Sequence, residues 1–327
     1  MTTDRLAQIF SGIGQKKIAV AGDFFLDEYL HIDPALDEPS IETGLTAYQV
    51  VSRAVSPGAA GTVAKNLAVL GVGSVYAVSV IGGDGRGFEL SGALKKLGVD
   101  TECLISAPSR ATPTYTKPMY GENPPRELNR LDVKNFSPTP AHIEDEIISN
   151  IKKAAAHADA LIIMDQVSEK DRGVVTERVR DFLIGLAKIM PGLIMIADSR
   201  SRIGSFANMI VKGNEREIPD AEETSRRLGN KPFFITLGEK GALAYENGRA
   251  VTIPPFEVKG PTDICGAGDA FTAGAAAALC CGASVCEAAA AGCLLASICV
   301  AQIGTTGQAT ADEMISKHKK IYSGGYQ

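Results

Sequence analysis

The chain has 327 residues, of which 45% are hydrophobic and 22% charged, and it carries a formal net charge of −5. This length and balance fit one large α/β unit and exclude a disordered chain. No long run of Lys or Arg occurs, so the overall field excludes attraction to nucleic acid or to an anionic membrane. An anionic small molecule would have to be held by a local cluster of cations.

Short apolar runs alternate with helical patterns along the chain. Strands that alternate with helices predict a mainly parallel sheet with helices on both faces, and ligands bind such sheets at the carboxyl ends of the strands. The predicted strands are 17–22, 74–81, 160–164, 193–197, 209–211 and 233–237. The predicted helices include 143–156, 174–190, 312–322 and one with apolar residues at 88, 90, 94 and 97.

Two segments, about 25–56 and 112–133, interrupt this alternation with β-branched and aromatic residues between Pro and Gly. We interpret them as extra strands that project from the main sheet and form a lid. Exposed apolar strand faces on such a lid favour pairing with a second copy, so we expect a homodimer through the lid.

The longest apolar stretch, 270–303, is rich in Ala and is divided by Gly282, Ser284 and Glu287. It predicts two buried helices joined by a tight turn rather than a membrane span. Six of the seven Cys fall at 265–299, and no C-x-x-C pair occurs. Together with an N-terminus that lacks the apolar core of a signal peptide, this pattern predicts free Cys that act as small core residues in a reducing cytoplasm.

The segment 260–274, G-P-T-D-I-C-G-A-G-D-A-F-T-A-G, carries the strongest chemical signal. Gly266, Ala267 and Gly268 form a turn that opens onto an Ala-rich helix, and free N–H groups at a helix N-terminus bind anions. Asp269 follows directly and could accept the proton of an attacking hydroxyl. This pairing suits phosphoryl transfer. The alternative is a Gly-rich turn with a helix-capping Asp.

This segment resembles the D-T-x-G-A-G-D signature of the ribokinase/PfkB carbohydrate kinase family, with Ile264 in place of Thr. Four further segments resemble the family's motifs in the same order: 22–27, 57–71, 212–217 and 236–241. The resemblance implies a ribokinase-like three-layer sandwich with a mainly parallel central sheet and a small β-strand lid, formed by residues 1–327 as a single domain. It implies ATP-dependent transfer of the γ-phosphate to a sugar hydroxyl.

Within the family, the chain is most similar to the bacterial D-glycero-D-manno-heptose 7-phosphate kinase branch. The shared segments are G-D-x-x-L-D-x-Y at 22–29 and R-L-D at 130–132, and I-G-T-T at 303–306 is similar to a late L-G-T-[ST] of the branch. The heptose enzymes often carry a second, nucleotidyl-transferring domain, for which we find no counterpart in this sequence.

By resemblance, Asp269 is the general base, and Gly266, Ala267 and Gly268 form the anion hole. The candidates for binding the sugar are Asp27, Asp23, Gly58, Ala59 and Thr62. The family has Gly at position 59 and Asn at position 62, so these departures leave the identity of the sugar open.

On the nucleotide side, Asn214 and Glu217 are expected to organise Mg²⁺ through water, although the same spacing is also a helix-capping signal. Asp263 occupies a position where many relatives bind K⁺, so K⁺ is an optional second ion. The other ATP-binding candidates are Thr236, Gly238, Gly241 and Gly304.

Lys117, Arg130 and Arg200 are the candidates for gripping a phosphate already present on the substrate, the alternative for each being a solvated surface cation. No P-loop and no protein-kinase motif occurs. The open alternatives are a nucleoside or phosphofructose kinase of the same family, and a sugar-binding regulator without catalysis.

Overall fold

The computed structural model describes residues 1–121, 125–229, 231–304 and 306–323. Residues 122–124 of the predicted lid, Thr305 of the late heptose-branch motif and the end of the chain at 324–327 lie outside the described residues.

The first strand, β1, shows why the main sheet forms. Its apolar residues alternate between the two faces and all are buried, Ile18 and Val20 on one side and Ala19 and Ala21 on the other. A strand that is apolar on both faces belongs inside a parallel sheet covered by helices on both sides. β1 pairs in parallel with β6 and β11, at the centre of the sheet.

Nine strands of the described chain form this sheet in the order β16-β15-β14-β13-β12-β11-β1-β6-β7. The strands from β7 to β14 run parallel, and β15 and β16 extend the sheet as antiparallel strands. Their bounds are β1 Lys17–Gly22, β6 Ser74–Gly82, β7 Leu104–Ala107, β11 Ala160–Asp165, β12 Ile194–Ser199, β13 Ile210–Asn214, β14 Phe233–Thr236, β15 Ala242–Glu246 and β16 Arg249–Ile253. The six predicted strands are therefore confirmed.

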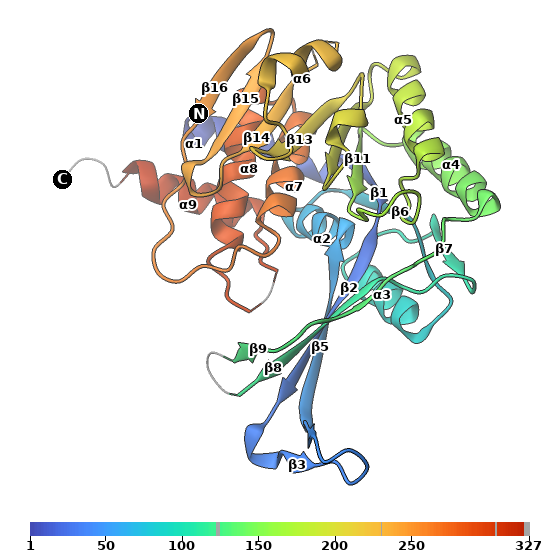
Figure 1. Ribbon diagram of the computed structural model, residues 1–327. Coiled ribbons are helices and arrows are strands. Elements are labelled where there is room, and N and C mark those ends of the chain that lie inside the picture. The colour runs from blue at the N-terminus through green and yellow to red at the C-terminus, as the bar shows by residue number, and fades with distance from the viewer. Residues whose placement is uncertain (122–124, 230, 305, 324–327) are drawn as a thin grey trace.

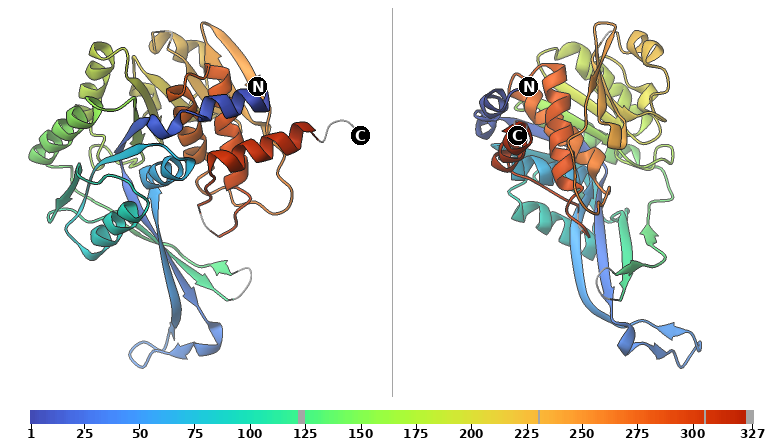
Figure 2. Two further views of the ribbon diagram at one scale, coloured as in Figure 1. Left: turned by 180° about the vertical axis from the view of Figure 1, so that it is seen from behind. Right: turned by 90° about the vertical axis from the view of Figure 1, so that its left-hand side faces the viewer.

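Helices cover both faces and complete three layers (Figure 1). One core cluster joins the sheet to α1, α2, α3, α7, α8 and α9, and the other joins it to α4 and α5. The first and last helices pack together, and the Thr3 hydroxyl lies 2.9 Å from Nδ1 of His318 (Figure 2). The helices are α1 Thr3–Phe10, α2 Ala60–Leu70, α3 Gly85–Lys96, α4 Ala141–Ala155, α5 Glu177–Ile189, α6 Ala221–Arg227, α7 Ala267–Cys280, α8 Val285–Cys299 and α9 Ala311–Ser323.

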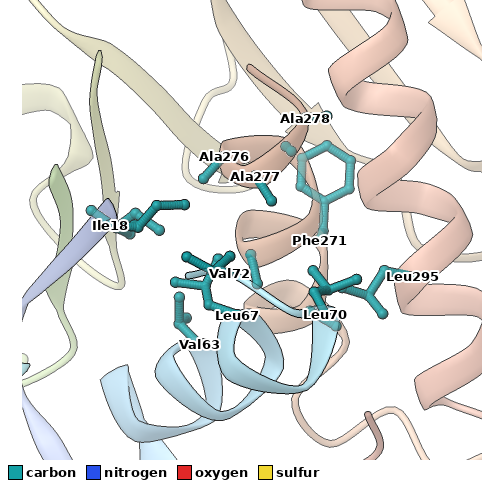
Figure 3. Close-up of a cluster of buried hydrophobic side chains, with 14 of the residues drawn as sticks. Ile18, Val63, Leu67, Leu70, Val72, Phe271, Ala276, Ala277, Ala278 and Leu295 are labelled. Atoms are coloured by element: carbon teal, nitrogen blue, oxygen red, sulfur yellow. The ribbon is translucent and has the colours of Figure 1, made fainter. Parts of the chain in front are cut away.

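The Ala-rich stretch forms α7 and α8, which confirms the prediction of two buried helices. Small residues let their backbones approach, since a Cβ on Gly292 would lie 2.8 Å from the Phe271 carbonyl oxygen, and one on Gly274 would lie 3.1 Å from that of Ala291. Figure 3 shows Phe271 and the Ala residues of α7 packed against α2 and α8. None of the helices in the described ranges is long and apolar enough to span a bilayer.

A smaller sheet projects away from the main one (Figure 1). Its order is β10-β8-β2-β5, with β9 also paired to β8. β2 and β5 are antiparallel, and a short hairpin of β3 and β4 lies at the tip. The bounds are β2 Phe24–Ile32, β3 Glu38–Pro39, β4 Thr46–Ala47, β5 Val50–Ala59, β8 Thr114–Tyr120, β9 Arg126–Glu127 and β10 Leu131–Val133.

Three local expectations are corrected. Phe88 belongs to the predicted apolar pattern of α3 but is 81% exposed. Helix α5 begins at Glu177 rather than at residue 174, because the Thr176 side chain caps it by accepting from the Val179 N–H. Cys265 is exposed, so it is not one of the small core residues.

Candidate active site

The N-terminus of α7 forms one wall of the candidate site. Gly266 is the N-cap in the left-handed conformation, with φ 77°, and no side chain caps the helix. Among the described residues, the N–H groups of Gly266, Gly268 and Asp269 have no protein acceptor, whereas the N–H of Ala267 donates to the Ile264 carbonyl at 3.2 Å. Of the predicted anion hole, Gly266 and Gly268 therefore keep free donors, Asp269 adds a third, and Ala267 is already engaged.

A buried ion pair lies beside this turn. Nζ of Lys212, on β13, is 2.8 Å from Oδ2 of Asp198, on β12, and both residues are buried. The Thr272 hydroxyl of α7 also lies within hydrogen-bond distance of Asp198, at 3.2 Å. A Cβ on Gly268 would come within 2.9 Å of Lys212 Nζ, so the ammonium group covers the first turn of the helix. Sequence analysis missed both members of the pair.

This environment sets the protonation of Asp269. Burial, followed by the negative charge of Asp198, raises the pKa of Asp269 to about 7, and the cations Lys212 and Arg200 oppose this rise. The Asp269 carboxylate has no hydrogen-bond donor within the described parts of the chain. A free carboxylate with a pKa near neutrality suits a general base.

Asp27, on β2, is the second free carboxylate. It is 6% exposed, yet no hydrogen bond to its side chain occurs among the residues that the structure describes. Burial raises its pKa, although neighbouring cations act in the opposite direction. A Cβ on Gly58 would lie 2.7 Å from Oδ2 of Asp27, so glycine is needed for this approach. Buried carboxylates normally find donors, so Asp27 is arranged to accept them from a ligand.

Asp23 is different, and its predicted contact with the sugar is corrected here. Its two oxygens accept the backbone N–H groups of Gln166, Val167 and Val174 at 2.7–2.9 Å, and the residue is 3% exposed. Burial raises its pKa to about 6, with Asp165 adding to this effect and the backbone donors opposing it. Asp23 therefore anchors the loop after β11.

Replacing Asp23 with Ala should lower the free energy of unfolding by at least about 1–3 kcal/mol, the cost of one buried donor left without an acceptor. Urea denaturation measures this change. An unchanged stability combined with a raised KM for the sugar alone would return Asp23 to the substrate site.

Thr62 also departs from its predicted role. It is 1% exposed, its hydroxyl donates to the Pro57 carbonyl at 3.3 Å, and its methyl group faces Gly266. It supports the turn from behind and is not placed to contact a sugar. Ala59 has a positive φ of 53°, a strained conformation for a residue with a side chain, where the family has Gly.

The predicted metal-organising pair follows β13. The Asn214 N–H donates to Oε2 of Glu217 at 2.8 Å, and Oδ1 of Asn214 accepts the N–H of Glu217 at 3.1 Å. These are the reciprocal hydrogen bonds of a capping box, but they close a turn at 215–217 and no helix begins there, because α6 begins at Ala221 with Asp220 as its N-cap. Oε1 of Glu217 is left without a partner among the described residues. Such an oxygen could accept a hydrogen bond from a water molecule bound to Mg²⁺. Burial raises the pKa of Glu217.

The remaining nucleotide-side candidates lie on neighbouring loops. Thr236 pairs in register with Asn214, and Gly238 and Gly241 flank the turn between β14 and β15, both with positive φ. Asp263 accepts the N–H groups of Cys265 at 2.9 Å and Gly304 at 3.3 Å. Asp263 and Gly304 are thus neighbours, and the binding of K⁺ stays a prediction.

The three predicted phosphate-gripping cations have different partners. Lys117 donates to the Tyr29 hydroxyl at 3.2 Å. Arg130 binds Asp132 through two hydrogen bonds and covers the ring of Tyr115 at 4.1 Å. Arg200 is exposed at the carboxyl end of β12. The charges of Lys117 and Arg130 oppose the rise in the pKa of Asp27, whereas the charge of Arg200 opposes the rise in the pKa of Asp269.

Lys65 is a third residue that sequence analysis missed. It is 7% exposed, and its Nζ donates to the carbonyl and hydroxyl oxygens of Thr306 at 2.5 and 2.9 Å. Thr306 and Thr62 both lie about 3.3–3.4 Å from the position of a Cβ on Gly266. Lys65 thereby fixes the wall behind the anion hole. A Lys inside the apolar pattern of 60–70 was the available signal.

Residues 25–312 match the model of the pfkB family carbohydrate kinases. The chain belongs to the pfkB family of carbohydrate kinases. This is the family that the order of its motifs predicts.

Curated relatives include the Bifunctional protein HldE of Bradyrhizobium diazoefficiens, 30% identical over 94% of this chain, and that of Pelobacter propionicus, 26% identical over 95%. The chain spans only 64% and 65% of the length of these two relatives.

Solved structures confirm the ribokinase-like fold with its small second sheet. Ribokinase of Thermotoga maritima has a TM-score of 0.66 at 23% identity, covering 93% of this chain and 99% of its own. The nucleoside kinase of Methanocaldococcus jannaschii has a TM-score of 0.62 at 20% identity, covering 93% and 98%. At such identities the likeness concerns the fold alone.

Proposed function

We propose that this pfkB-family protein transfers the γ-phosphate of ATP to a hydroxyl of a sugar or sugar phosphate, with heptose 7-phosphate as the first candidate. The observation that carries the proposal is the pair of free carboxylates, Asp27 and Asp269, whose charges influence each other beside the open N–H groups of α7. The motif resemblance to the heptose 7-phosphate kinase branch and the matches to HldE proteins support the choice of substrate.

In this mechanism Asp27 accepts hydroxyl groups of the sugar and so orients it. Asp269 takes the proton of the attacking hydroxyl, and the N–H groups of Gly268 and Asp269 stabilise charge on the phosphoryl group in transfer. Glu217, with Asn214, would hold Mg²⁺ through water, and the ion would neutralise charge on the nucleotide phosphates.

The small sheet acts as a lid in this proposal, and the chain acts as one kinase unit with that lid. Closure over the sugar would exclude water and suppress hydrolysis of ATP. The lid carries apolar side chains on its surface, which supports a homodimer through it. The most exposed of these are Ile41, Leu45, Leu131, Val51 and Leu36. A cytoplasmic location is part of the same proposal.

The pKa of Asp269 predicts the pH dependence of the reaction. The base must be unprotonated, and its pKa is raised to about 7, so kcat/KM should fall as the pH is lowered through about 7. Initial rates at subsaturating sugar between pH 5 and 9 measure this limb. A flat profile down to pH 5 would contradict the assignment of Asp269 as the base.

A substrate panel tests the proposed function. ATP consumption is measured with sugars, sugar phosphates and nucleosides, with Mg²⁺ and with or without K⁺. Turnover on a sugar, or on a sugar phosphate other than fructose phosphate, supports the proposal, and turnover on a nucleoside or fructose phosphate alone favours the alternative kinases of the family. Binding of sugar without turnover of any compound would favour a regulator without catalysis.

A further inference from the structure

A small cavity lies next to the sugar-binding strand, between the base of the lid and the carboxyl ends of β11 and β12. It has a volume of about 40 Å³, whereas about 10–15 Å³ suffices for one water molecule. The cavity therefore has room for about three waters. This space suits a small anionic group such as a phosphate. Its lining includes Phe25, Tyr115, Lys134, Gln166, Arg172 and Arg200.

Charge distinguishes this cavity from the rest of an acidic chain. Lys134, Arg172 and Arg200 line it, against one carboxylate, Glu169, which lies 3.3 Å from Lys134 Nζ. Within the described ranges, the guanidinium groups of Arg172 and Arg200 have no acidic partner. Two unpaired guanidinium groups on one small cavity offer the planar donors that phosphate accepts.

Gln166 gives an independent indication of a ligand. The residue is 8% exposed, and its side-chain amide has no hydrogen-bond partner among the described residues. Neither amide atom is completely sealed from solvent, and the residue lines the cavity. A buried amide without a partner is normally completed by water or a ligand, so Gln166 adds a donor to the cavity.

The wall of the cavity is held in place before any ligand binds. Asp23 accepts the N–H groups of Gln166 and Val167, and Arg202 donates to the carbonyl of Ser168 at 2.9 Å. Arg110 donates to the carbonyl of Arg172. These contacts fix the loop that carries Gln166 and Arg172, so a ligand would lose little free energy in ordering it.

The position of the cavity relative to Asp27 and Asp269 decides which part of the substrate it receives. Phe25 lines the cavity two residues before Asp27 on β2, and Tyr115 pairs in register with Asp27. Arg200 lines the cavity and also lowers the pKa of Asp269. A sugar held by Asp27 with one hydroxyl at Asp269 would therefore direct another of its substituents toward this cavity.

The geometry points to this cavity as the subsite for a phosphate group already carried by the sugar, with Arg172, Arg200 and Gln166 as its donors. This inference rests on the proposed function, makes the acceptor a sugar phosphate, and retains Arg200 from the three cations predicted from the sequence.

The test compares D-glycero-D-manno-heptose 7-phosphate with the same heptose lacking the phosphate. Arg172→Gln is the informative variant, because the Arg172 side chain makes no protein hydrogen bond in the described chain. Arg249→Gln, on the exposed edge strand β16, removes the same charge away from the site. We measure kcat/KM and, by calorimetry without ATP, the Kd of each sugar.

We expect wild type and Arg249→Gln to favour the phosphorylated heptose equally. Arg172→Gln should lower kcat/KM and raise the Kd for that compound by about tenfold or more, the range for one lost hydrogen bond to a charged group, and so reduce the preference. Equal losses for both heptoses, a wild type without preference, or a wild type that does not bind the 7-phosphate would overturn the subsite. Tight binding without turnover would instead contradict the proposed kinase function and leave the subsite supported.

Discussion

Replacing Asp269 with Asn is expected to lower kcat by about 10²–10⁴-fold, the usual range for the loss of a general base. Asn keeps the size and the polar character of the side chain but cannot take a proton. The carboxylate is available for this task because no donor of the described chain occupies it and its pKa is raised to about 7. The loss is measured as the rate of product formation at saturating ATP and sugar.

Stability serves as the control for this variant. The pKa of Asp269 is raised from 3.8 to about 7, so its contribution to stability is complete below pH 3.8 and is lost as the pH rises through about 7. Asn cannot ionise, so the variant does not lose stability as the pH rises through about 7. It should therefore melt at a higher temperature than the wild type at pH 8, with a smaller difference near pH 4. A variant that keeps near-full activity would remove Asp269 from the mechanism.

Replacing Lys212 with Met should lower the free energy of unfolding by about 3–5 kcal/mol, because it leaves the buried carboxylate of Asp198 without its cation. It should also move the acidic limb of kcat/KM to higher pH, since the positive charge of Lys212 lowers the pKa of Asp269. Denaturant unfolding and the pH profile of the surviving activity measure the two effects.

The double variant Asp198→Asn with Lys212→Met separates the two consequences. It removes both charges, so it should recover part of the lost stability, because an unpaired buried charge costs more than a neutral pair. A loss of less than about 1 kcal/mol in the single variant, the magnitude of an exposed ion pair, would show that the pair is not the buried element described here.

Much of the fold could be predicted from local pattern. Runs such as 160–164, apolar on both faces, form strands only within a covered parallel sheet, and the Ala-rich stretch accepts only close helix packing. The exposure of Phe88 could not be predicted in this way, because periodicity identifies a helix but does not show how much of its apolar face neighbouring elements cover. The start of α5 at Glu177 depends on the cap at Thr176.

The candidate site was predictable where a motif carries its own geometry, as at 266–269. It was not predictable where a role depends on residues far apart in the sequence. Asp23 and Asp27 look alike four residues apart, but Asp23 is taken up by backbone donors from the loop at 166–174. Lys65 and Lys212 gain their positions from Thr306 and Asp198. These contacts come from the tertiary fold, which local composition does not encode.

The most direct test of the account is to incubate the protein with ATP, Mg²⁺ and D-glycero-D-manno-heptose 7-phosphate and to follow the sugar by mass spectrometry, with Asp269→Asn in parallel. The account predicts that the sugar gains one phosphoryl group in the wild type while ADP accumulates in equal amount, and that Asp269→Asn forms this product at least about a hundredfold more slowly. An unmodified sugar in the wild type, or equal product in both proteins, would contradict it.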